Sequence, residues 1–248
     1  MSELQHPESR PFERVAEVYE RARPEYPPDA VAWTAERLGL EQGRTVLDLG
    51  AGTGKLTRAL VQTGARVIAV EPGERMLAEL RRVVPSAEAV QGAAEAIPLE
   101  DESVDAITVG QAFHWFRHDE AVPELHRVLR HGGGVALIWN NRDPNDALQT
   151  EITNLIRELP ARRARIEHSA KRLIKSGLFG QVEERRFSFV QELDADDLVA
   201  RIASISYVAA APPDRQAELE RQLRELAAAH GGRIAFPYVS DVYVSRAV

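Results

Sequence analysis

The chain has 248 residues, of which 44% are hydrophobic and 28% charged, an ordinary composition for a globular protein with one sizeable core. Its formal net charge of −7 gives no general attraction to phosphate backbones or anionic lipid, so we expect neither a nucleic-acid nor a membrane partner. The absence of cysteine excludes disulfides, thiolate metal sites and cysteine nucleophiles. The seven histidines show no metal-ligand spacing, so no metal site is expected.

The first residues, Met1 to Pro7, lack the basic region and apolar stretch of a secretory signal. No apolar run approaches the ~20 residues that span a bilayer. We therefore expect a cytoplasmic protein.

The N-terminal region reads as two helices separated by prolines. A helical pattern runs from about Phe12 to Ala22, and the proline-rich segment 23–28 must break it, because each proline restricts the residue before it. Residues 29–38 predict a second helix, for which Gly39 is a natural stop. We expect residues 1–40 to form a helical flap.

From Thr45 onward, short apolar runs alternate with amphipathic helical patterns. This alternation indicates parallel βαβ units with right-handed crossovers. We expect Gly132, Gly133 and Gly134 to end the helix before the last of these strands in a left-handed turn. The predicted strands are Thr45–Leu49, Arg66–Val70, a weaker Ala87–Gln91, Val104–Val109 and Val135–Trp139.

After Trp139 we predict a loop over Asn140–Pro144. A helical stripe follows from Leu148 to Leu159, then a strand at Val182–Val190, a helical stretch over 194–230 and a closing strand at Phe236–Val244. The helical stretch, interrupted by Pro212-Pro213, is therefore expected as a cap inserted before the last strand of a single domain, residues 1–248.

The most informative segment joins the first buried strand to a helix and carries Asp48, Gly50, Gly52, Gly54 and Lys55. The segment does not match a phosphate-binding P-loop. Three residues, not four, separate the first glycine from the Gly-Lys pair, and a leucine follows the lysine where the P-loop pattern has serine or threonine. The dinucleotide fingerprint is weakened, because the third glycine comes one residue early and Lys55 takes its place. A purely structural turn is the remaining alternative.

The spacing Asp-x-Gly-x-Gly-x-Gly resembles the first motif of the class I S-adenosylmethionine-dependent methyltransferases. Glu71 ends the second strand, at the distance where an acid binds ribose hydroxyls in such sheets. The segments 92–99 and 101–105 resemble the adenine-side loop of that family. Many members carry an aspartate where Ala93 stands, so here a backbone carbonyl or Glu95 must bind the adenine amino group, or that contact is missing.

The resemblance implies an α/β fold: a Rossmann-like, seven-stranded, mostly parallel sheet whose last strand is antiparallel, with helices on both faces. It implies S-adenosylmethionine as cofactor and S-adenosylhomocysteine as product. The residues that it places around the cofactor are Asp48, Gly50, Ala51, Gly52, Thr53, Gly54, Glu71, Pro72, Met76, Ala94, Glu95 and Gln111.

Segments 111–116 and 139–143, with Tyr19 and residues 23–27, resemble small-molecule methyltransferases grouped with trans-aconitate methyltransferase. This implies methyl transfer to a small-molecule acceptor, which we expect to be a carboxylate or a hydroxyl. The residues expected at the acceptor are Tyr19, Arg23, Tyr26, Trp115, Trp139 and Arg142.

His114 is the candidate catalytic base, because histidine titrates near neutral pH. It is alternatively a hydrogen-bond donor that only positions the acceptor. If the acceptor is a carboxylate, no base is needed and an arginine clamp is expected.

Two other functions stay open at this point. A nicotinamide-dependent oxidoreductase would bind NAD and need a hydride-transfer partner such as a Tyr-Lys pair, which we do not find. A non-catalytic S-adenosylmethionine-binding protein would bind the cofactor without an accessible acceptor site. Fold analogy carries the reaction class but not the acceptor.

Overall fold

The structure is a computed structural model that describes residue 20, residues 22–156 and residues 169–248. Most of the helix predicted from Phe12 to Ala22 therefore lies outside the described residues, as does Leu159. The second predicted helix is present as α3, Pro28–Leu38, and Gly39 ends it in the left-handed conformation.

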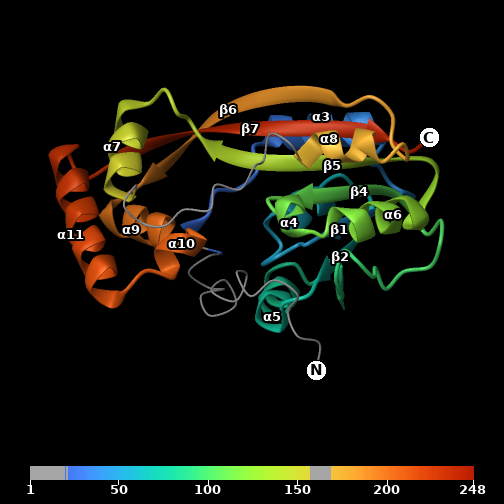
Figure 1. The fold of residues 1–248 in the computed structure, drawn as a ribbon, viewed down its shortest axis with the longest axis horizontal. Coiled ribbons are helices and arrows are strands. Elements are labelled where there is room, and N and C mark those ends of the chain that lie inside the picture. Colours follow the sequence, from blue (N-terminus) through green and yellow to red (C-terminus); the bar gives the residue numbers. More distant parts are fainter. Residues whose placement is uncertain (1–19, 21, 157–168) are drawn as a thin grey trace. The chain divides into compact units, whose positions relative to one another are not determined.

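The centre of the fold is a seven-stranded sheet with strand order β3-β2-β1-β4-β5-β7-β6 (Figure 1). Strands β1 to β5 pair in parallel, whereas β7 runs antiparallel to its neighbours, as predicted. The strands are β1 Thr45–Leu49, β2 Arg66–Glu71, β3 Glu88–Gln91, β4 Val104–Gly110, β5 Leu129–Arg142, β6 Glu183–Leu193 and β7 Ile234–Arg246.

Helices connect the strands, and the predicted helical insertion lies between β6 and β7. It consists of α9 Ala195–Ala203, α10 Ser206–Ala209 and α11 Pro213–Ala229. Pro213 takes the first position of α11, where its missing N–H costs nothing. The remaining described helices are α4 Lys55–Val61, α5 Glu74–Val83, η2 Phe113–Trp115, α6 His118–Val128, α7 Ala147–Ile156 and α8 Ser169–Lys175.

The sequence prediction was wrong about β5, which begins earlier and ends later than residues 135–139. Its helix neighbour α6 ends at Val128, and Leu129 is already extended, so the glycines lie within β5 and do not cap the helix. Val104 pairs with Leu129 but Ala106 pairs with Gly134, so β4 and β5 lose register at this point. The glycine-rich segment therefore forms an irregular stretch of strand.

Close approach of the backbone explains a glycine at this irregularity. A Cβ on Gly133 would lie 2.9 Å from the carbonyl oxygens of Arg130 and Asp105. At the other end of β5, residues 140–142 continue the strand, whereas the sequence predicted a loop from Asn140.

The chain divides into two compact units, which we name here. The sheet unit comprises Glu25–Asn140, Ala164–Phe187 and Ser240–Val248. The helix-rich unit comprises Met1–Pro24, Asn141–Arg163 and Ser188–Val239. Strands β5, β6 and β7 contribute residues to both units.

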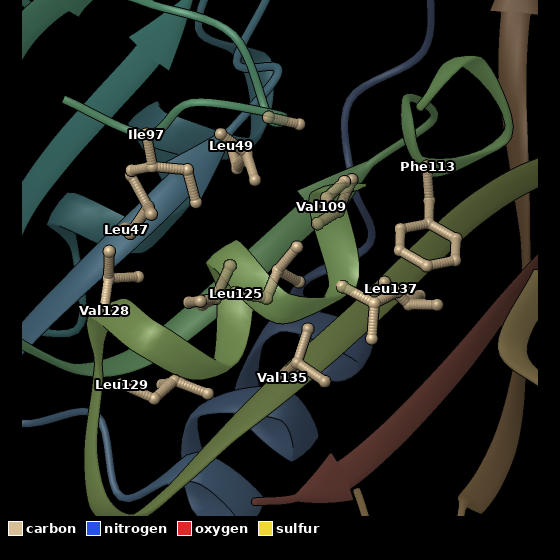
Figure 2. Packing of buried hydrophobic residues seen from close by; sticks show 14 of the residues in the cluster. Leu47, Leu49, Ile97, Val109, Phe113, Leu125, Val128, Leu129, Val135 and Leu137 are labelled. Carbon is tan, nitrogen blue, oxygen red and sulfur yellow. The ribbon is translucent and has the colours of Figure 1, made fainter. Parts of the chain in front are cut away.

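The sheet unit has a core on each face of the sheet. On one face, Leu125 and Val128 of α6 pack against apolar side chains of the strands, including Leu47, Val109 and Val135 (Figure 2). On the other face, α3 and α4 pack against alternate residues of the same strands. The strands are thus buried on both sides, as their continuous apolar sequences predict.

The helix-rich unit has its own apolar cluster. It is formed by α7, α9 and α11 together with parts of β6 and β7, and it includes Leu198, Leu223 and Phe236. None of the described helices is both long and apolar enough to cross a membrane.

Candidate active site

Residues 50–54, which we call the glycine loop, lie between β1 and α4 and are hydrogen-bonded to the end of β2. The backbone N–H groups of Gly50 and Ala51 donate to the carbonyl oxygen of Val70, at 2.8 and 3.1 Å. The loop therefore starts at the carboxyl ends of two adjacent parallel strands, the edge at which α/β sheets bind ligands.

All three glycines of this loop have positive φ, and two of them, Gly50 and Gly52, differ clearly in their surroundings. A Cβ on Gly50 (φ 70°) would lie 2.7 Å from the Ala112 side chain, so this position requires glycine for packing. A Cβ on Gly52 (φ 58°) would meet no atom of the described residues within 4 Å. The Gly52 side of the loop is therefore open, which suits close approach of a ligand to the backbone.

Glu71 ends β2 beside this loop. One of its carboxylate oxygens accepts the N–H of Gly52 at 2.9 Å, and the other accepts the N–H of Gly73 at 2.9 Å. These two bonds orient the Glu71 carboxylate at the end of β2, and a carboxylate is the kind of acceptor that ligand hydroxyls need. The predicted juxtaposition of the glycine loop and Glu71 is present.

Asp48 lies beneath the loop and is 1% exposed. Its carboxylate accepts hydrogen bonds from the hydroxyls of Thr57 at 2.6 Å and Thr108 at 3.3 Å. Burial raises the pKa of Asp48 to about 6, although these hydrogen bonds act in the opposite direction. Asp48 thus ties β1 to α4 and β4, which makes it a residue that positions the loop.

The segment after β3 also meets the end of β2. Gly92 N–H donates to the carbonyl of Glu71 at 3.3 Å, and Ala94 is buried. The Glu95 carboxylate accepts the backbone N–H of Arg117 at 2.8 Å, next to the start of α6. One oxygen of the predicted adenine-side residue Glu95 therefore orients the 92–95 loop.

Gln111 follows β4 with φ 58°, an uncommon conformation for a residue other than glycine. Its N–H donates to the carbonyl of Ile138 at 2.9 Å, and its side-chain amide donates to the carbonyl of Asn140 at 3.1 Å. These bonds offset the backbone strain and hold Gln111 between the ends of β4 and β5.

His114 lies in the short helix η2, and its Nδ1 is 3.4 Å from the indole Nε1 of Trp139. Because the indole can only donate, Nδ1 accepts and the proton of the neutral ring is on Nε2. Burial, with a smaller contribution from His118, lowers the pKa of His114 to about 4. At neutral pH this imidazole is uncharged and offers an N–H donor on Nε2.

The two tryptophans predicted at the acceptor differ in burial. Trp139 is fully buried in the sheet-unit core and packs edge-to-face on Tyr243, so its role here is to orient His114. Trp115 is only partly buried, and its ring centre lies 4.7 Å from that of His114. Trp115 therefore has surface available for a ligand, whereas Trp139 has none.

Tyr26 is fixed at the end of β4, where a Cβ on Gly110 would overlap its hydroxyl. Its neighbour Glu25 accepts hydrogen bonds from Lys55 at 2.8 Å and Arg58 at 3.0 Å, both on α4. The glycine loop, Glu71, the 92–95 segment, Gln111 and Tyr26 thus converge on the carboxyl ends of the parallel strands.

Comparison with known proteins bears on this arrangement. A family model described as a methyltransferase domain matches residues 47–137. An uncharacterized methyltransferase of Mycobacterium tuberculosis is 39% identical over 228 residues, which cover 90% of this chain and 89% of that protein. An uncharacterized methyltransferase of Schizosaccharomyces pombe is 34% identical over 209 residues, 84% of this chain and 83% of that protein.

The chain belongs to the class I S-adenosylmethionine-dependent methyltransferases. Its fold is shared by a solved structure of a putative methyltransferase from an antibiotic biosynthesis pathway of Anabaena variabilis. The TM-score is 0.68 at 24% identity, over 90% of this chain and 98% of that one.

The other predicted residues of this methyltransferase belong to the helix-rich unit, lie outside the described residues, or are further positions of the sheet unit. Arg23 and Arg142 belong to the helix-rich unit, where Arg23 donates to the carbonyl of Ser204 at 2.6 Å and Arg142 donates to Thr153 at 3.0 Å. Tyr19 lies outside the described residues. The predicted cofactor residues Thr53 and Met76 are buried, and Pro72 directly follows Glu71.

Sequence reasoning missed Arg201, a residue of α9 that is only 3% exposed. Its Nε donates to the hydroxyl of Tyr238 at 2.6 Å. A signal was available, because Arg201 stands three residues after Leu198 and beside Ile202, on the stripe that α9 buries.

Proposed function

We propose that this protein transfers a methyl group from S-adenosylmethionine to a small organic acceptor. The observation that carries the proposal is the bond between the Gly52 N–H and the Glu71 carboxylate, at the open side of the glycine loop. The bond fixes the Glu71 carboxylate, which can accept hydrogen bonds from ligand hydroxyls, next to the Gly52 backbone, which a ligand can approach.

The residues present fit the cofactor. A carboxylate accepts two ribose hydroxyl protons without strain, and the bonds from Gly52 and Gly73 hold the Glu71 carboxylate at the end of β2. Within the described part of the chain, no atom lies within 4 Å of a Cβ on Gly52, which provides room for a ligand beside that carboxylate. When bound, the cofactor supplies a methyl group attached to a positively charged sulfur. The neutral thioether formed when the methyl group is transferred is a good leaving group.

The chain itself then needs to align the acceptor and exclude water. Alignment can supply ~7–11 kcal/mol of a barrier. His114 is better suited to orient an acceptor through its Nε2 proton than to remove a proton, since its pKa is about 4 and Nδ1 is engaged by Trp139. Tyr26 and Trp115 are the proposed walls of the acceptor site.

The acceptor that we propose is a small molecule with a carboxylate or a hydroxyl group. The resemblance to the trans-aconitate methyltransferase group supports it and stays a prediction. A nicotinamide-dependent oxidoreductase is disfavoured, because the fingerprint's third glycine is replaced by Lys55, whose ammonium is engaged by Glu25.

The direct test is transfer of a labelled methyl group from S-adenosylmethionine to a panel of small carboxylic acids, alcohols and amines. We expect a labelled product with at least one acid or alcohol. Transfer to amines alone would contradict the proposed acceptor class. Cofactor binding without transfer to any member of a broad panel would favour the non-catalytic alternative.

A further inference from the structure

The helix-rich unit buries two guanidinium groups for which the described residues provide no counter-ion. Arg201 is 3% exposed, and Arg142, the last residue of β5, is partly buried, with its Nη1 atom fully enclosed. On each of the two side chains, Nη1 has no hydrogen-bond partner. Neither arginine makes an ion pair within the part of the chain that the structure describes.

The two side chains come from neighbouring stretches of the helix-rich unit. The N–H of Asp143 donates to the carbonyl of Pro237 at 3.2 Å, which places Arg142 and the Arg201 partner Tyr238 each one residue from this bond. The charge of Arg201 lowers the pKa of Arg142, together with the larger effect of burial. Tyr207 and Tyr238 act on the same group in the opposite direction. Two like charges in one buried place are unfavourable unless an anion joins them.

Three carboxylates of this unit have other partners. Asp146 accepts the N–H of Gln149 at the start of α7, and Asp194 accepts the N–H of Asp197 at the start of α9. Asp196 pairs with the exposed Arg224. Arg142 and Arg201 form no such ion pair with the carboxylates of the described residues.

Both side chains are held by neutral groups that leave their charge uncompensated. The Arg142 guanidinium donates to the Thr153 hydroxyl at 3.0 Å. The Arg201 guanidinium donates to the Tyr238 hydroxyl at 2.6 Å and lies over the Tyr238 ring, 5.6 Å from its centre. The Tyr238 ring is fixed by stacking on Phe189, with centroids 5.1 Å apart. The guanidinium groups are therefore oriented before any ligand binds.

We propose that Arg142 and Arg201 together bind one oxyanion, a carboxylate or a phosphoryl group of a small-molecule ligand. Guanidinium groups whose Nη1 lacks a hydrogen-bond partner match the planar or branched oxygens of such anions. The anion site lies within the helix-rich unit and does not depend on the proposed function.

The probes are succinate, inorganic phosphate and the neutral dimethyl succinate, titrated by calorimetry into the full-length protein. We expect succinate or phosphate to bind and to raise the melting temperature, and dimethyl succinate to do neither. A preference for succinate assigns a carboxylate, and a preference for phosphate assigns a phosphoryl group. Binding of neither anion would overturn the proposal.

The variant Arg142→Met should lose at least tenfold in anion affinity. Without anion its melting temperature should equal or exceed that of the wild type, because an unpaired buried charge is removed. A merely structural arginine would instead lower the melting temperature. Arg221→Met, which removes an exposed charge from α11, is the matched control and should bind the anion like the wild type. Equal losses in both variants would contradict a specific site.

Arg142→Lys provides a second variant that keeps the charge and loses the planar fork. We expect several-fold weaker anion binding with unchanged stability, and wild-type affinity would count against the proposal. Titration of the same samples with S-adenosylhomocysteine separates the two claims. Binding of S-adenosylhomocysteine without the anions would refute this inference alone, and the reverse would refute the proposed function alone.

Discussion

At the scale of single residues, the glycine loop and Glu71 carry the account of cofactor binding. The sequence predicted that they would meet, because a short loop after one parallel strand and an acid at the end of the next share one sheet edge. It did not predict the bond from Gly52 to Glu71. That bond depends on the left-handed backbone conformations of Gly50 and Gly52, and a glycine in a sequence permits such a conformation without requiring it.

Replacing Glu71 with glutamine should weaken S-adenosylmethionine binding at least several-fold. The amide keeps one acceptor oxygen but loses the charge and replaces the second acceptor with a donor. Calorimetric titration measures the change, with Glu88→Gln, an exposed residue of β3, as the matched control. Unchanged affinity in a folded Glu71→Gln protein would refute the ribose assignment.

The buried imidazole of His114 should make folding depend on pH. Its pKa is about 4 in the folded state and about 6.5 when unfolded, so the unfolded chain binds more protons between these values. Stability from this group is fully present above pH 6.5 and is lost as the pH falls toward 4, by about 3 kcal/mol.

The contribution of Asp48 to the pH dependence of stability has the opposite sign, over nearly the same pH range. Its pKa is raised to about 6, so the folded state binds more protons and this group favours folding more as the pH falls from 6 to 4. The two contributions offset in the wild type. We therefore expect His114→Gln to become progressively more stable than the wild type in urea unfolding as the pH falls below 6.5. A pH-independent difference would contradict the buried, neutral imidazole.

At the scale of elements, apolar periodicity located the strands and helices well, because strands buried on both faces and amphipathic helices have distinct patterns. It failed at β5. A glycine run is typical of a helix end, whereas Gly133 lies inside this strand, where a Cβ would meet the carbonyl oxygens of Arg130 and Asp105. The approach of Asp105, which is distant in the sequence, leaves no local pattern.

Gly133→Ala should destabilise the protein by roughly 1–3 kcal/mol, because the new Cβ would meet two carbonyl oxygens at 2.9 Å. Gly180→Ala is the matched control: it also lacks a left-handed φ, and its Cβ would have only ordinary contacts, the nearest at 3.5 Å. Thermal unfolding of the two variants measures the difference. Equal effects would mean that the irregularity in β5 tolerates a side chain.

At the scale of the whole molecule, the order of the elements followed from the sequence, including the helical insertion between β6 and β7. The assignment of the candidate site residues to two separate compact units could not be predicted from the sequence. Tyr26, His114 and Trp115 lie in the sheet unit, and Arg23 and Arg142 lie in the helix-rich unit with Arg201. Whether a buried charge has a counter-ion can be judged only when the burial of each side chain is known. The composition therefore could not indicate that Arg142 and Arg201 form no ion pair with the described residues.

The central claim is that the strand-end site of the sheet unit binds S-adenosylmethionine. Parallel calorimetric titrations of the full-length protein with S-adenosylmethionine, S-adenosylhomocysteine and NAD test it most directly. We predict saturable binding of both adenosyl ligands and none of NAD. Binding of NAD alone, or of none of the three, would contradict the account.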